Sequence, residues 1–277
     1  MPTTGQLALL ILAAALFAAS VIASVLRSRK VAAAPSSAPR GPQRAGPVTV
    51  GTLAGGIVAS VGVIIWHAAS RGHWLPINDN FEALVWLGAL LALFVLYIQT
   101  TRPLGALDWF ITPVAILLLL GAAFFGRVEY HDYVNSTWSW LHRATSYAGA
   151  VAFAIAAAAG AMYVVTSRRL RSKTPVGPNL GSLERLEHLT MTAVTLGFAL
   201  LTIGTITGGV RMLEGAKNTP PTKLVLALAV WVVYAIVLHA PINPSFRGRK
   251  VAVLSMVGFV LMIGAIVAVQ FLPESAT

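Results

Sequence analysis

Six histidines are the side chains of this sequence best suited to chemistry, because the chain contains no cysteine. The absence of cysteine excludes disulfides, thiolate metal sites, cysteine nucleophiles and thiol–disulfide exchange by this chain. Histidine binds haem iron as an axial ligand, so the histidines are the residues to examine for a haem site. The six are His67, His73, His131, His142, His188 and His239.

Tryptophans accompany the first four of these histidines. A flat aromatic ring can pack against a porphyrin face, so Trp66, Trp74, Trp138 and Trp140 favour a haem site near them. Two structural explanations remain open. A histidine at a helix end can hydrogen-bond a carbonyl or a lipid headgroup, and tryptophan is enriched at both interfaces of any membrane protein.

The segment 72–82 (GHWLPINDNFE) is unusually polar for a loop that leads directly into an apolar run. Asp79 or Asn80 is suited to cap the helix that follows, with Glu82 in its first turn complementing the helix dipole. A carboxylate so close to a bilayer is also expected to pair with Arg71, Arg143 or a nearby histidine.

The elements that position these residues are predicted to be transmembrane helices. The chain has 277 residues, of which 57% are apolar and 10% charged, with a mean hydropathy of +0.77. A soluble domain carries about 25% charged residues. Apolar runs of helical length, without the period-2 alternation of a membrane barrel, predict an all-α polytopic bundle of about eight transmembrane helices. The runs lie near 5–26, 48–69, 81–100, 109–126, 141–167, 189–212, 223–240 and 251–272.

The basic residues predict the orientation of these spans. Fourteen of the 20 lysines and arginines fall on one side, in 27–44, 102, 168–185 and 247–250. The positive-inside rule places this side in the cytoplasm and both termini outside. The first run lacks a basic residue before it, so we favour a retained helix over a cleaved signal peptide. The stretch 27–47 is predicted to be a basic linker, which gives a first helix and linker (1–47) and a transmembrane domain (48–277).

Small residues are predicted to serve helix packing. Gly51 with Gly55, and Gly204 with Gly208, have GxxxG spacing, which lets helices approach closely. No Walker loop, dinucleotide fingerprint, zinc-protease motif or nucleophile elbow is present.

Four stretches, in this order, give the sequence a resemblance to a known family. They are GHWLPINDNFEAL (72–84), WLHRATSYAGA (140–150), SLERLEHLTMTAVTLGFALLTIGTITGGV (182–210) and VLHAPINPSFRGRKVAVLSMVGF (237–259). From about residue 60 onward, the chain resembles the cytochrome c assembly membrane family of the CcsA/ResC type and its HemX-like relatives.

The resemblance implies haem export or presentation to apocytochrome c at the outer membrane face. It assigns His142 to the external haem-ligand histidine and His239 to the histidine of the seventh span, both as ligands of the iron of haem b. Two features depart from the family pattern. The loop MLEGAKNTPPTK (212–223) lacks the family's tryptophans, and no histidine follows the last span in FLPESAT. These departures favour the HemX-like branch.

The sequence therefore predicts a haem-handling protein of cytochrome c maturation in the bacterial inner membrane, working with partner membrane proteins. His67 and His73 are secondary ligand candidates. No enzymatic activity is expected, since haem attachment needs thiols that this chain cannot supply. The alternatives are a regulatory or scaffolding protein of the haem pathway that does not transfer haem, and a small-solute transporter.

Overall fold

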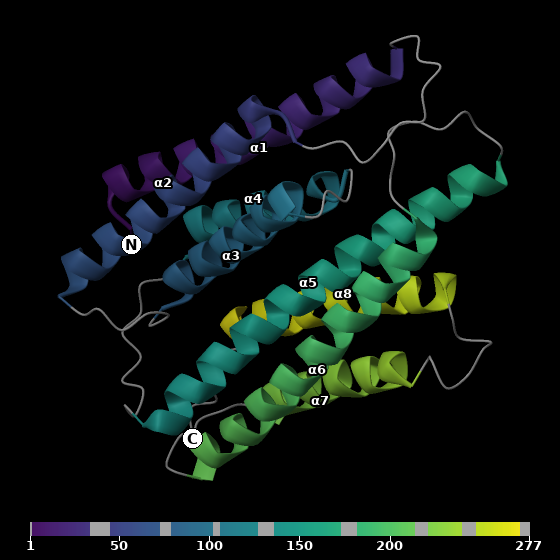
Figure 1. The fold of residues 1–277 in the computed structure, drawn as a ribbon. Helices are drawn as coiled ribbons and strands as arrows, with labels where there is room; N and C mark the ends of the chain where they lie inside the picture. Colours follow the sequence, from purple (N-terminus) through teal and green to yellow (C-terminus); the bar gives the residue numbers. More distant parts are fainter. Residues whose placement is uncertain are drawn as a thin grey trace. The chain divides into compact units, whose positions relative to one another are not determined.

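The computed structural model of the chain describes residues 2–33, 45–72, 79–101, 106–126, 136–172, 182–213, 221–239 and 248–271. These residues form eight α-helices and no strand, so the all-α prediction is confirmed for them (Figure 1). The helices are α1 (Thr4–Ala33), α2 (Pro47–Arg71), α3 (Asn80–Thr101), α4 (Asp108–Phe125), α5 (Thr137–Arg171), α6 (Leu183–Leu213), α7 (Pro221–Leu238) and α8 (Arg249–Phe271).

Local sequence signals set several helix ends. Pro47 occupies the first turn of α2, where a missing N–H costs nothing. Gly72 ends α2 in a left-handed conformation (φ 72°), and its N–H bonds the carbonyl of Ala69. Glu184 lies in the first turn of α6, where a carboxylate complements the helix dipole.

Helices α1 to α6 are each long and apolar enough to cross a membrane, and Val225–Leu238 of α7 is a shorter apolar helix. This supports a polytopic membrane bundle, while the number of eight spans stays a prediction. The helices extend beyond the predicted apolar runs. For example, α5 covers Thr137–Arg171 rather than 141–167, because a helix continues through polar residues that an apolar window leaves out.

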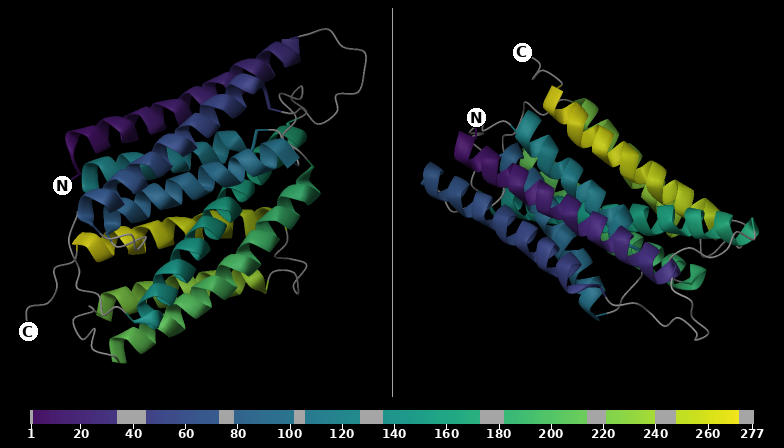
Figure 2. Two further views of the ribbon diagram at one scale, coloured as in Figure 1. Left: turned by 60° about the vertical axis from the view of Figure 1, so that its left-hand side comes forward. Right: turned by 90° about the horizontal axis from the view of Figure 1, so that it is seen from above.

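The chain divides into two compact units, which are Met1–His131 with Arg169–Ser182, and Asp132–Arg168 with Leu183–Thr277. In the first unit, α1 packs against α2 and α4, and α3 packs against α2 and α4. Figure 2 shows α1 and α2 side by side in both views. Helix α1 thus packs within this unit, and the division predicted at residue 47 stays a prediction.

Helices α1 and α2 approach each other most closely at a glycine outside the predicted pair, Gly51 and Gly55. A Cβ atom added at Gly51 would meet nothing, and one at Gly55 would make an ordinary contact with Leu16. A Cβ atom added at Gly56, however, would lie 2.5 Å from the ring of the fully buried Phe17. The glycine at which α1 approaches most closely is therefore Gly56, while of the predicted pair Gly55 packs against Leu16 and Gly51 does not take part.

In the second unit, α7 packs against α6 and α8. Helix α5 approaches α6 at Gly149, which faces Gly197 and Leu200, and approaches α8 at Gly160, which faces Ala252. The buried rings of Phe153 and Tyr234 stack with centroids 3.5 Å apart. The small residues of α5 thus allow close packing, as predicted.

The orientation of the spans is open to a direct test. A reporter fused after Pro175 should be cytoplasmic, and one fused after Lys217 should be external, because the 14-to-6 distribution of basic residues sets topology. Paired alkaline phosphatase and green fluorescent protein fusions give the measurement. An external location at Pro175, beside four basic residues of 168–173, would contradict the orientation.

Candidate functional site

His142 lies near the start of α5 and is fixed by a backbone carbonyl of α6. Its Nδ1 is 2.7 Å from the carbonyl oxygen of Gly204. A carbonyl only accepts hydrogen bonds, so Nδ1 carries a proton, and in the neutral imidazole Nε2 then carries the lone pair. A histidine that ligates a metal commonly donates its other N–H to a carbonyl or carboxylate, which fixes the tautomer and the ring orientation. His142 therefore has the arrangement of an oriented ligand.

Two glycines of α6 make this contact possible. A Cβ atom added at Gly208 would lie 2.9 Å from both Cε1 and Nδ1 of His142, and one at Gly204 would lie 2.8 Å from Oγ of Ser146. The hydroxyl of Thr207 donates to the carbonyl of Ile203 at 2.7 Å and lies 3.1 Å from the Gly204 carbonyl. The packing prediction for Gly204 and Gly208 is thus confirmed, and the imidazole occupies the space that the missing side chain leaves.

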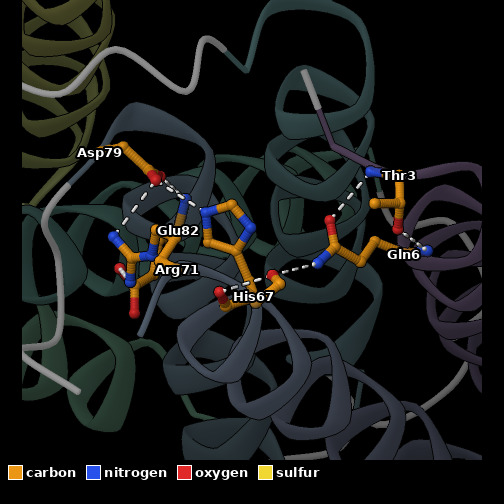
Figure 3. Close-up of polar contacts among 7 residues, drawn as sticks. Thr3, Gln6, His67, Arg71, Asp79 and Glu82 are labelled. Atoms are coloured by element: carbon orange, nitrogen blue, oxygen red, sulfur yellow. Dashed lines mark hydrogen bonds and ion pairs between the residues drawn. The ribbon is translucent and has the colours of Figure 1, made fainter. Parts of the chain in front are cut away.

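A buried ion cluster joins α2 to α3 in the first unit (Figure 3). Nε2 of His67 is 2.7 Å from Oδ2 of Asp79. Arg71 is 3.4 Å from the same oxygen through Nη1, and 2.7 Å from Oε2 of Glu82 through Nη2. The side chains of Arg71 and Glu82 are only 5% and 1% exposed. We call these four residues the α2–α3 ion cluster.

The α2–α3 ion cluster agrees with the polar loop prediction. Oδ1 of Asp79 accepts the backbone N–H of Glu82 at 2.7 Å, so Asp79 caps α3. The predicted partners Arg71 and a histidine are both present, with the histidine being His67. Arg143 belongs to the other unit.

The N-terminal end of α1 lies at the same end of the first unit as this cluster. Nε2 of Gln6 donates to Oγ of Ser70 at 3.2 Å, and that hydroxyl donates to the carbonyl of His67. The start of α1 and the end of α2 therefore lie at the same end of the first unit, as the predicted orientation requires. The side of the membrane stays a prediction.

The predicted convergence of His67, His73 and His142 at one haem site stays a prediction. His73, Trp74 and His131 lie outside the described residues. His67 and His142 belong to different compact units. Among the described residues, His67 is engaged by Asp79 and its ring lies against Phe81, with centroids 4.9 Å apart.

His239 is exposed, and its Nδ1 bonds the carbonyl of Ala235 in its own helix at 2.7 Å. A histidine so near the end of an apolar helix is expected to face the interior of the bundle with a hydrogen-bond partner. The partner is present, but the side chain is exposed. Val230, Tyr234 and Val237 form the buried side of α7, and two residues beyond Val237 a side chain points nearly the opposite way. Its assignment as a haem ligand stays a prediction.

The described tryptophans near the histidines are partly exposed. Trp66, Trp138 and Trp140 are 46%, 42% and 50% exposed. Their exposure agrees with an interfacial aromatic belt.

A second polar group in the first unit was not predicted from the sequence. Asp108, directly before an apolar run, is buried at the start of α4. Next to it, Nε1 of Trp109 donates to Oγ of Ser24 in α1 at 3.0 Å. The signal available in the sequence was an acidic residue and an indole next to each other at the edge of a span.

The sequence matches the family described as "Cytochrome C assembly protein" over residues 74–276. Among curated proteins, it is 46% identical over 78 residues to "Cytochrome c biogenesis protein CcsA" of Thermosynechococcus vestitus, covering 27% of this chain and 24% of that protein. It is 23% identical over 242 residues to the protein of that name from Prochlorococcus marinus, covering 76% of each, and 24% identical to that from Guillardia theta, covering 77% of this chain and 79% of that protein.

The alignments thus cover only 24% and 27% of the CcsA proteins of Thermosynechococcus vestitus and Nostoc punctiforme, but 76% and 79% of those of Prochlorococcus marinus and Guillardia theta. No solved structure gives a significant match. The family match covers well over half of the chain and includes α3 to α8. The chain therefore belongs to the cytochrome c assembly protein family.

Proposed function

We propose that this protein handles haem for cytochrome c maturation, and that it holds haem through His142 at the outer end of the α5–α6 pair. The observation that carries the proposal is the 2.7 Å bond from Nδ1 of His142 to the Gly204 carbonyl. This bond orients the ring and reserves the Nε2 lone pair for a metal. Family membership and relatives named for cytochrome c biogenesis support the choice of haem as cargo.

Haem supplies an iron that one neutral imidazole can bind axially. The chain's own contribution is to hold and orient that imidazole against the backbone of α6. With no cysteine, the chain cannot form the thioether bonds of c-type haem, so haem b would be held without covalent attachment. The chain would then act as a carrier rather than an enzyme, with apocytochrome c and other assembly proteins of the bacterial inner membrane as partners. His239, His67 and His73 are secondary ligand candidates.

Replacing His142 with glycine tests the proposal. The protein purified in detergent should show a haem Soret band, His142→Gly should lose most of it, and added imidazole should restore it by occupying the vacated position. His188→Gly is the matched control, because His188 is an exposed histidine near the start of α6. A Soret band in His142→Gly equal to that of the unchanged protein, at equal protein content, would remove His142 from the site.

A regulatory or scaffolding role without haem transfer is the second candidate function. The observation in its favour is the loop 212–223, which contains no tryptophan, where the resemblance leads one to expect several. The absence of any Soret band from the purified protein, even after haemin is added, would favour this role.

A further inference from the structure

Two arginines lie beside His142 in the second unit. Arg143 follows it on α5, and Arg211 is in the last turn of α6. Both are close enough to act electrostatically on the imidazole. They also belong to the minority of six basic residues that fall on the predicted outer side, so the positive-inside rule does not account for them.

The helical register places Arg211 over the imidazole. Gly204, Gly208 and Arg211 are spaced by four and three residues, which puts them on one stripe of α6. Gly208 is the position whose added Cβ atom would touch the His142 ring. Side chains of a helix tilt toward its N-terminus, so this register directs Arg211 back toward the turn that contains Gly208.

Arg143 contributes a second guanidinium from the facing helix. Its Nε donates to the carbonyl of Ser139 in its own helix at 3.2 Å, which anchors the side chain along α5. A guanidinium has five N–H donors in a planar fork, and this fork matches the two oxygens of a carboxylate. Two groups that recognise carboxylates therefore act electrostatically on the imidazole of His142.

We propose that Arg143 and Arg211 bind the two propionate carboxylates of haem whose iron is ligated by His142. The proposal rests on the proposed function and extends it from the iron to the edge of the porphyrin. It assigns the recognition of the cargo to three residues on one pair of helices. The structural alternative for Arg211 is that it only complements the negative end of the α6 dipole.

Haemin and haemin dimethyl ester distinguish these interpretations, since the ester keeps the iron but lacks both negative charges. Each is titrated into the purified full-length protein and followed by Soret absorption. Arg211→Gln and Arg143→Gln should each weaken haemin binding roughly tenfold, as expected for the loss of a charge-assisted hydrogen bond. Their affinity for the ester should equal that of the unchanged protein. Arg249→Gln, at an exposed arginine that begins α8, is the matched control.

The possible outcomes separate the two proposals. If His142→Gly loses the Soret band but the arginine variants bind haemin as the unchanged protein does, the propionate assignment fails and the function stands. If the arginine variants lose equal affinity for haemin and for its ester, the propionate assignment also fails, and the arginines have a structural role instead. Loss of bound anionic phospholipid without loss of haemin affinity would assign the arginines to lipid headgroups instead. If the unchanged protein binds neither porphyrin, the proposed function itself fails.

Discussion

Arg71→Met should lower the free energy of unfolding by about 3–5 kcal/mol, the range expected when one partner of a buried ion pair is removed. Arg71 is the cation that contacts both carboxylates of the α2–α3 ion cluster, and its side chain is 5% exposed. Methionine retains most of the apolar stem, so the change chiefly removes charge. Glu82, whose side chain is 1% exposed, would keep a buried negative charge without its guanidinium partner.

Unfolding in mixed detergent and sodium dodecyl sulfate micelles, followed by circular dichroism, measures this effect. Arg249→Met is the matched control and should change stability by less than about 0.5 kcal/mol, because that arginine is exposed. The double variant Arg71→Met/Glu82→Gln should recover part of the loss, since it also removes the charge of the carboxylate that loses its guanidinium. A stability of Arg71→Met equal to that of the control would contradict the structural importance of the cluster.

Gly208→Val should destabilise the second unit by about 1–3 kcal/mol, as expected for overpacking, and should weaken haem binding. A Cβ atom there would lie 2.9 Å from two atoms of the His142 ring. The ring must then move away from the Gly204 carbonyl, or α5 must separate from α6. Either response removes the hydrogen bond that orients the imidazole.

Gly209→Val provides a close control, because it adds the same side chain one residue away, where a Cβ atom would meet nothing within 4 Å. Its stability and Soret band should match those of the unchanged protein. Unfolding titrations of the two variants measure the packing effect independently of haem. Equal stabilities would contradict the close contact between α6 and the His142 ring.

The sequence by itself determined the class of protein and the local parts of the site. An apolar content of 57% with 10% charged residues leaves no soluble surface, and helices satisfy their backbone hydrogen bonds within one segment, so the helical membrane class follows from composition. The cap of Asp79 on α3 and its pairing with Arg71, eight residues away, were also predictable. They depend on residues joined by one short loop.

The tertiary structure decided how each helix is rotated about its own axis and how far it is shifted along the helix next to it. Helix α7 is apolar on all sides, so its sequence does not indicate that Tyr234 and Val237 face inward and His239 outward. For the same reason, the sequence of α2 does not indicate that Gly56, rather than Gly51 or Gly55, lies against the ring of Phe17 in α1. Without a polar face, the hydrophobic pattern of a membrane helix does not specify which side meets its neighbours.

The partner of His142 was likewise decided by tertiary structure. The Gly204 carbonyl that fixes the ring is 62 residues away in the chain, and every residue carries a carbonyl, so no side-chain type marks it. Gly204 and Gly208 did indicate a close helix approach, but the sequence did not say that an imidazole would fill it. The relative position of two packed helices selects which carbonyl a side chain meets, because that position depends on the packing of all their side chains together.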